Sequence, residues 1–153
     1  MSRIFAFTDG VFAIAITLLV LQIDLPTSVD SNSELWAALG DQKGDLFSYA
    51  LSFIVIGFFW IGNHRLMRQI AEFDRGLMLI NIIYLGFVVL VPFTSELIGD
   101  LGEYLISVVI YSSNMAAVAL LSYWMKVHIL RNGLAVKGYE WDMRLTCKSN
   151  LFN

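Results

Sequence analysis

The chain has 153 residues, of which 58% are hydrophobic and 15% are charged, and its formal net charge is −3. Soluble domains are nearer half apolar and a quarter charged, and one of this length has too little interior to hide so much apolar surface. The composition therefore favours a membrane protein, and the negative charge argues against a nucleic-acid partner. The one cysteine, Cys147, allows no internal disulfide.

Four long apolar segments, at about residues 4–23, 46–67, 76–98 and 104–127, predict four transmembrane helices. Each is near the roughly 20 residues that cross a bilayer as a helix. Helices are favoured because backbone polar groups in lipid must be satisfied within the segment. We therefore expect an all-α polytopic transmembrane bundle over residues 1–131, followed by a polar tail over 132–153.

The first apolar segment also resembles the start of a signal peptide, because Arg3 precedes it. Asp9 interrupts the run early, however, and no small-x-small cleavage site precedes Pro26. We therefore expect a transmembrane helix here and no cleaved signal.

The charges between the apolar segments predict how the helices are oriented. The stretches between the first and second helices and between the third and fourth are acidic, and the stretch between the second and third is basic, as is the chain after the fourth. Basic residues mark the cytoplasmic side, so both termini are expected there. Within residues 24–43, Leu35 and Trp36 indicate a short amphipathic piece at the membrane interface.

The sequence shows no sign of an enzyme. No catalytic motif is present, and the two histidines, His64 and His128, lie at or near predicted helix ends. An intramembrane hydrolase needs nucleophiles, acids or metal ligands at membrane depth, and no apolar segment holds a pair of carboxylates. We therefore expect no catalysis, no cofactor and no resident metal.

The first apolar segment has two different faces. At about 100° per residue, Ile14, Leu18 and Leu21 share one side, Thr17 borders it, and Asp9 points roughly opposite. Periodicity alone allows the aliphatic stripe to be a packing seam or a lipid contact. A carboxylate inside a span is costly and is usually paired or functional, and Arg3 is one available partner.

Residues 3–21, with the sequence RIFAFTDGVFAIAITLLVL, resemble the first helix of the transmembrane protein 175 family of potassium channels. The family's signature is Arg, three residues, then Phe-Ser-Asp. Arg3, Phe7, Thr8 and Asp9 match it, with threonine in place of serine. Weaker similarities follow at Trp60 and His64 and at residues 92–94.

The resemblance implies a potassium-selective or weakly selective cation channel in a prokaryotic plasma membrane. Four identical subunits would place their first helices around the pore, with Ile14, Leu18 and Leu21 facing the ions and Ile14 at the narrowest point. Such aliphatic rings form a hydrophobic constriction, and Thr17 could offer a hydroxyl beside it. The signature residues would hold this helix from behind by a hydrogen-bond network, comprising Arg3, Phe7, Thr8, Asp9, Trp60 and His64, to which we add Asn81 as a polar residue inside the third segment.

Family members have six helices per subunit or repeat, whereas four are counted here. The chain is then either a fragment ending before two further helices or a shorter variant. Two other functions remain open: a non-conducting membrane protein that uses the stripe for assembly, and a small secondary transporter. Transporters usually carry broken helices and polar groups at the midplane, which this sequence offers sparingly.

Overall fold

The computed structural model of the chain describes residues 2–23, 30–41 and 43–136. It contains α1 (Ser2–Leu18), a 3₁₀ turn η1 (Leu19–Gln22), α2 (Asn32–Asp41), α3 (Lys43–Met67), α4 (Arg75–Leu101) and α5 (Leu105–Arg131). Within these residues the only β-pairing is an isolated bridge between Ile70 and Ala135. The predicted all-α fold is therefore confirmed.

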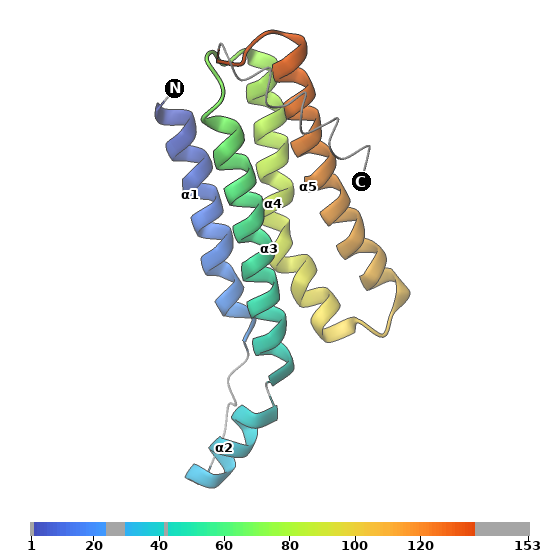
Figure 1. The fold of residues 1–153 in the computed structure, drawn as a ribbon. Helices are drawn as coiled ribbons and strands as arrows, with labels where there is room; N and C mark the ends of the chain where they lie inside the picture. Colours follow the sequence, from blue (N-terminus) through green and yellow to red (C-terminus); the bar gives the residue numbers. More distant parts are fainter. Residues whose placement is uncertain (1, 24–29, 42, 137–153) are drawn as a thin grey trace, which may run out of the picture.

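Helices α1, α3, α4 and α5 lie side by side, and α2 extends beyond one end of the bundle (Figure 1). Four helices in the described part of the chain are long and apolar enough to cross a membrane, and they correspond to the four predicted segments with ends shifted by a few residues. The chain is thus an integral membrane protein with several spans. Helix α4 packs against α1, α3 and α5, so it is the central support of the bundle.

The core of the bundle is mostly apolar and extends from its middle to the end where α3 stops and α4 begins. Phe12 and Ala15 of α1 and Leu19 of η1 belong to the same buried cluster as Ile56 of α3 and the buried side of α4. The remaining buried apolar residues of α4 and α5 are Leu77, Tyr84, Leu85, Val88, Val91, Val118, Met125 and Ile129. Burial of these side chains leaves the opposite helix faces for lipid or for other chains.

Helix α4 contains Pro92, and Figure 1 shows the helix changing direction along its length. Proline lacks the backbone N–H and crowds the preceding turn, which bends a helix. The adjacent Thr94 hydroxyl donates to the Val91 carbonyl at 3.2 Å.

The predicted amphipathic piece forms α2. Ser31 caps this helix by accepting a hydrogen bond from the Glu34 backbone N–H at 3.2 Å. Trp36 is 77% exposed, and Leu35 and Leu39 are also exposed. The helix thus presents apolar side chains outside the bundle.

The loop between α3 and α4 is fastened to the segment that follows α5. The Ala71 N–H donates to the Leu134 carbonyl at 2.8 Å, and the Val136 N–H donates to the Gln69 carbonyl at 2.9 Å. Gly133, at a φ of 64°, makes the turn that brings this segment back. Residues 132–136 of the predicted tail therefore pack on the bundle, and residues 137–153, with Cys147, lie outside the described residues.

Candidate functional site

Helix α1 and the η1 turn present an aliphatic stripe that the single chain leaves uncovered. Ile14 is 58% exposed, Leu18 39% and Leu21 74%. Gly10 lies one turn before Ile14, and a Cβ atom added there would meet nothing within 4 Å. Spacings of three and four residues keep these positions on one side of the helix. This side is available to lipid or to another copy of the chain.

The opposite face of α1 is buried in the bundle. Thr8, Phe12, Ala15 and Leu19 follow the same spacing, and all four are buried. Phe12 packs against Tyr84 of α4, with 6.1 Å between the ring centroids. The two faces of α1 therefore have different surroundings, as the angular count predicts.

Two hydrogen bonds join the first turns of α1 to its neighbours. The Trp60 indole Nε1 donates to Asp9 Oδ1 at 2.9 Å, and Asn81 Nδ2 donates to Thr8 Oγ1 at 3.0 Å. One bond reaches α3 and the other reaches α4. Together they restrict both the rotation of α1 about its axis and its height in the bundle.

His64 lies one helical turn after Trp60, and the two ring centroids are 5.4 Å apart. No hydrogen bond joins His64 to a described residue through its side chain. Its contact with Asp9 is therefore indirect, through the indole that it packs against.

Arg3 and Phe7 lie outside this network in the single chain. Arg3 is exposed and makes no side-chain hydrogen bond or ion pair with a described residue. Phe7 is 57% exposed and precedes Ile14 by seven residues, which puts it on the stripe side of α1 and away from Thr8 and Asp9. Its hydrocarbon ring also has no group that could donate or accept a conventional hydrogen bond.

Thr17 is exposed beside the stripe. Its hydroxyl donates to the Ile14 carbonyl at 2.9 Å. The hydroxyl hydrogen is therefore used within the helix, while the oxygen lone pairs remain on the exposed side.

Asn63 is a buried polar residue beside this network that the predicted site does not include. Asn63 Nδ2 and Asn81 Oδ1 find no hydrogen-bond partner among the described residues. Tyr84 donates from its hydroxyl to the Phe59 carbonyl at 3.5 Å, which brings Asn63, one turn after Phe59, roughly level with Asn81 on the antiparallel helix. Asn63 could have been found from the sequence as an asparagine inside an apolar segment, which is the same feature that singled out Asn81.

Two more polar contacts hold α4 in place. In the half of the bundle nearer α2, the hydroxyls of Ser52 and Ser95 are hydrogen-bonded. Asn114 of α5 donates to Thr94 at 3.2 Å in the same region. These residues tie α4 to α3 and to α5.

At the other end of the bundle, Asp74 joins the start of α4 to the end of α5. Its Oδ1 accepts from the Leu77 N–H at 2.7 Å, and its Oδ2 lies 2.8 Å from His128 Nε2. These hydrogen bonds, led by the one from Leu77, lower the pKa of Asp74 below its ordinary value. The carboxylate is thus both a helix cap and an inter-helix contact.

In the described residues, no group of three or more His, Cys, Asp or Glu side chains could hold a metal ion. The arrangement instead consists of one helix with an uncovered aliphatic side and a polar attachment behind it. Such an arrangement suits a helix that must be held in a fixed orientation.

The sequence model of the family described as "Endosomal/lysosomal potassium channel TMEM175" matches residues 3–92. A potassium channel of Streptomyces collinus is 40% identical over 138 residues, which cover 86% of this chain and 65% of that protein. The endosomal/lysosomal proton channel TMEM175 of Bos taurus is 36% identical over 93 residues, covering 56% of this chain and 19% of that protein. The chain thus spans less than two thirds of the length of these relatives.

Among solved structures, the chain is similar to the crystal structure of a lysosomal potassium-selective channel TMEM175 homolog from Chamaesiphon minutus. The TM-score is 0.73 at 31% sequence identity, and the match covers 87% of this chain and 74% of that one. The similarity therefore extends over most of the bundle and beyond the helix that carries the signature.

Proposed function

The chain belongs to the family of the endosomal/lysosomal potassium channel TMEM175, and we propose that it is a subunit of a potassium channel. The observation that carries this proposal is the uncovered aliphatic stripe of α1, which faces away from the hydrogen bonds that hold the helix. A helix that lines a pore needs two such faces. One face must be open to the ions, while the other must be held by the neighbouring helices.

In this proposal four copies of the chain surround the pore, with α1 of each copy nearest the axis. Ile14, Leu18 and Leu21 then form successive aliphatic rings, and Ile14 is the narrowest. Such rings exclude water when narrow. When wider, they favour K⁺ over Na⁺, since K⁺ loses part of its hydration shell at a lower cost. The expected selectivity is accordingly modest.

The rear of α1 is proposed to keep the stripe aligned with the axis. Thr8 and Asp9 would do this through Asn81 and Trp60, with His64 supporting the indole. For Arg3 we propose a contact with another subunit or with lipid headgroups, since it is exposed in the single chain. Phe7 would pack at the end of the stripe.

We place the channel in a prokaryotic plasma membrane with both ends of the described chain on the cytoplasmic side. The charge pattern supports this orientation, because Arg65, Arg68 and Arg75 lie at one end of the bundle while Glu96, Asp100 and Glu103 lie at the other. The acidic end would concentrate cations near the outer mouth of the pore.

The test is ion flux through the full-length protein reconstituted in liposomes loaded either with K⁺ or, in a separate preparation, with Na⁺. We expect K⁺ efflux that exceeds Na⁺ efflux, and fourfold stoichiometry by mass measurement in detergent. An assembled protein that passes neither ion would contradict the proposal. It would favour the alternative in which the stripe is a packing seam between subunits. In that case, polar substitutions in the stripe would separate the subunits without opening a leak.

A further inference from the structure

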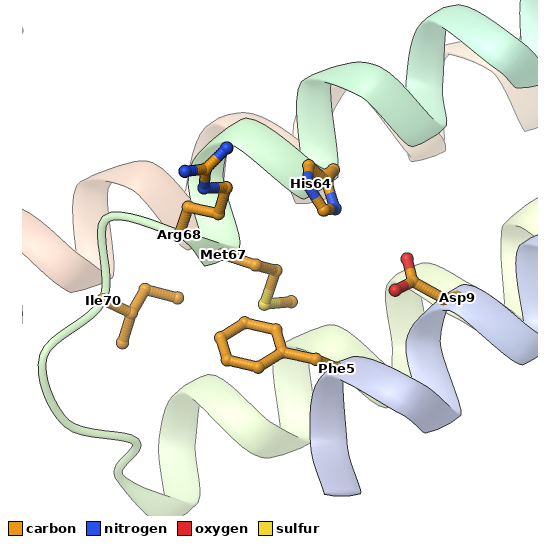
Figure 2. A pocket seen from close by; sticks show the side chains of 6 residues that line it. All are labelled: Phe5, Asp9, His64, Met67, Arg68 and Ile70. Atoms are coloured by element: carbon orange, nitrogen blue, oxygen red, sulfur yellow. The ribbon is translucent and has the colours of Figure 1, made fainter. Parts of the chain in front are cut away.

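A cavity of about 390 Å³ opens between the first turns of α1 and the end of α3. Figure 2 shows the residues that line it: Phe5, Asp9, His64, Met67, Arg68 and Ile70. Two helices and the loop after α3 contribute to its walls. The proposed conduction path lies on a different side of α1, so this cavity has no role in it.

The cavity carries one negative and one positive side chain that do not pair with each other. Asp9 Oδ1 accepts from Trp60, while its other oxygen has no partner among the described residues. The Arg68 guanidinium is exposed and makes no hydrogen bond or ion pair with a described residue. Both charges are therefore available to an occupant of the cavity.

The remaining walls are mostly apolar. Met67 and Ile70 are buried residues of the core, and Phe5 packs edge-on against Phe73 with 5.8 Å between ring centroids. His64 lies across the cavity from Asp9 and adds a ring that can donate or accept (Figure 2). The cavity thus suits a molecule that has charges of both signs on a partly apolar body.

The cavity lies at one end of two candidate spans and extends into them. The candidate spans are Arg3–Leu21 and Gly44–Met67. Phe5 lies in the first turn of one span and Met67 is the last residue of the other, and these two ends meet at the cavity. Arg68 and Ile70 lie just beyond the second span. Asp9 is about 9 Å inside the span, counted as six residues from Arg3 at the rise of an α-helix. An occupant can therefore enter from the adjacent leaflet.

We propose that this cavity binds the headgroup of a zwitterionic aminophospholipid, namely phosphatidylethanolamine. Its phosphate would meet the Arg68 guanidinium, a donor suited to phosphate oxygens. Its primary ammonium would donate to the free oxygen of Asp9, near the ring of Phe5. An anionic headgroup without an amine would bring no positive charge to the second oxygen of Asp9, and a trimethylammonium group has no N–H to donate.

The experiment is native mass spectrometry of the whole protein released from mixed membranes that contain phosphatidylethanolamine, phosphatidylcholine and phosphatidylglycerol. We expect selective retention of phosphatidylethanolamine. Arg68→Ala should lower that retention about tenfold, as expected for the loss of one charge-assisted hydrogen bond. Arg65→Ala is the matched control, because Arg65 is an exposed arginine of the same helix end that does not line the cavity.

Asp9→Asn tests the amine contact separately. An amide can still accept from Trp60, so the fold should persist while the preference over phosphatidylglycerol falls. Equal losses in Arg68→Ala and Arg65→Ala would overturn the proposal in favour of general charge attraction. Equal retention of all three lipids by the wild type would also overturn it. Because the readout is bound lipid, either result is independent of whether the protein conducts K⁺.

Discussion

Asn81 is a buried amide whose two ends have different surroundings. Its Nδ2 donates to Thr8, whereas its Oδ1 has no partner among the described residues. A polar pair between helices in a membrane contributes about 0.6 to 2 kcal/mol. At the residue scale, the polar contacts that orient α1 are therefore few, and each is of modest strength.

Replacing Asn81 with leucine should destabilise the protein by about that amount, 0.6 to 2 kcal/mol, because the Thr8 hydroxyl loses its inter-helix partner. The measurement is thermal unfolding in detergent. Ile82→Leu is the control, since Ile82 is the next residue and is exposed. If both variants unfold at the same temperature as the wild type, the Thr8–Asn81 contact does not stabilise the bundle.

Asp74 gives a prediction that depends on pH. Its pKa is lowered in the folded protein, so its stabilisation is fully present above the ordinary value of 3.8 and is lost as the pH falls through the lower folded value. Asp74→Ala should cost about 0.5 to 2 kcal/mol at neutral pH through loss of the helix cap. Unfolding curves at neutral and acidic pH check this, and the difference from the wild type should shrink in acid.

Glu72→Ala is the matched control for Asp74→Ala. Glu72 is an exposed acid of the same loop and makes no side-chain hydrogen bond or ion pair with a described residue. A loss of stability in Glu72→Ala equal to that in Asp74→Ala would mean that loop charge, and not the cap and the His128 contact, is responsible.

At the scale of single helices, two glycines of α4 should respond oppositely to alanine. A Cβ atom at Gly76 would lie 2.8 Å from His128 Cε1, whereas one at Gly86 would meet nothing within 4 Å. Gly86→Ala should stabilise the helix by up to about 1 kcal/mol through helix propensity. Gly76→Ala should not stabilise the protein, because the new Cβ atom forces the His128 ring away from Asp74.

Unfolding of the two variants in the same detergent provides the comparison. A His128→Ala background supplies the control, since removal of the ring should let Gly76→Ala recover the gain seen for Gly86→Ala. Failure to recover would show that some other contact limits position 76.

The helices and the two faces of α1 could be predicted from the sequence because both follow from local periodicity. The helix ends were less accurate: α4 begins at Arg75 because Asp74 caps it, and α5 continues to Arg131 until the Gly133 turn. Contacts between helices could not be predicted from periodicity. Periodicity gives the direction of each side chain around its own helix, but it does not give the rotation of the neighbouring helix. The Asp74–His128 contact joins residues 54 apart in the sequence. The burial of Asn63 likewise depends on how its neighbours pack.

At the scale of the whole molecule, Ile14→Asn should change ion passage while leaving assembly intact. A polar ring at the proposed narrowest point would hold water more readily, so we expect more flux and less preference for K⁺. Leu120→Asn on α5 is the control, because Leu120 is also exposed but belongs to a helix that packs on α4. Flux in liposomes is the measurement, and an unchanged pore would remove Ile14 from the constriction.

Asp9→Ala should act on the assembly instead. Loss of the Trp60 contact frees the start of α1 from α3, so we expect fewer intact oligomers in detergent, as measured by size and mass. Asp9→Asn, which keeps an acceptor for the indole, should assemble normally. A change in ion preference with assembly fully retained would instead place Asp9 on the conduction path.

The polar contacts of the bundle lie in both of its halves, and most of the side chains buried between them are apolar. Thr8–Asn81 and Asp74–His128 lie at one end, and Ser52–Ser95 lies at the other. Helix α4 is hydrogen-bonded at separated heights to α3 and to α5, while α1 is hydrogen-bonded near one end and is packed by apolar side chains further along. We therefore expect α1, α3, α4 and α5 to move as one rigid body, so that any opening or closing would take place by tilting of whole subunits against one another and not by rearrangement within one.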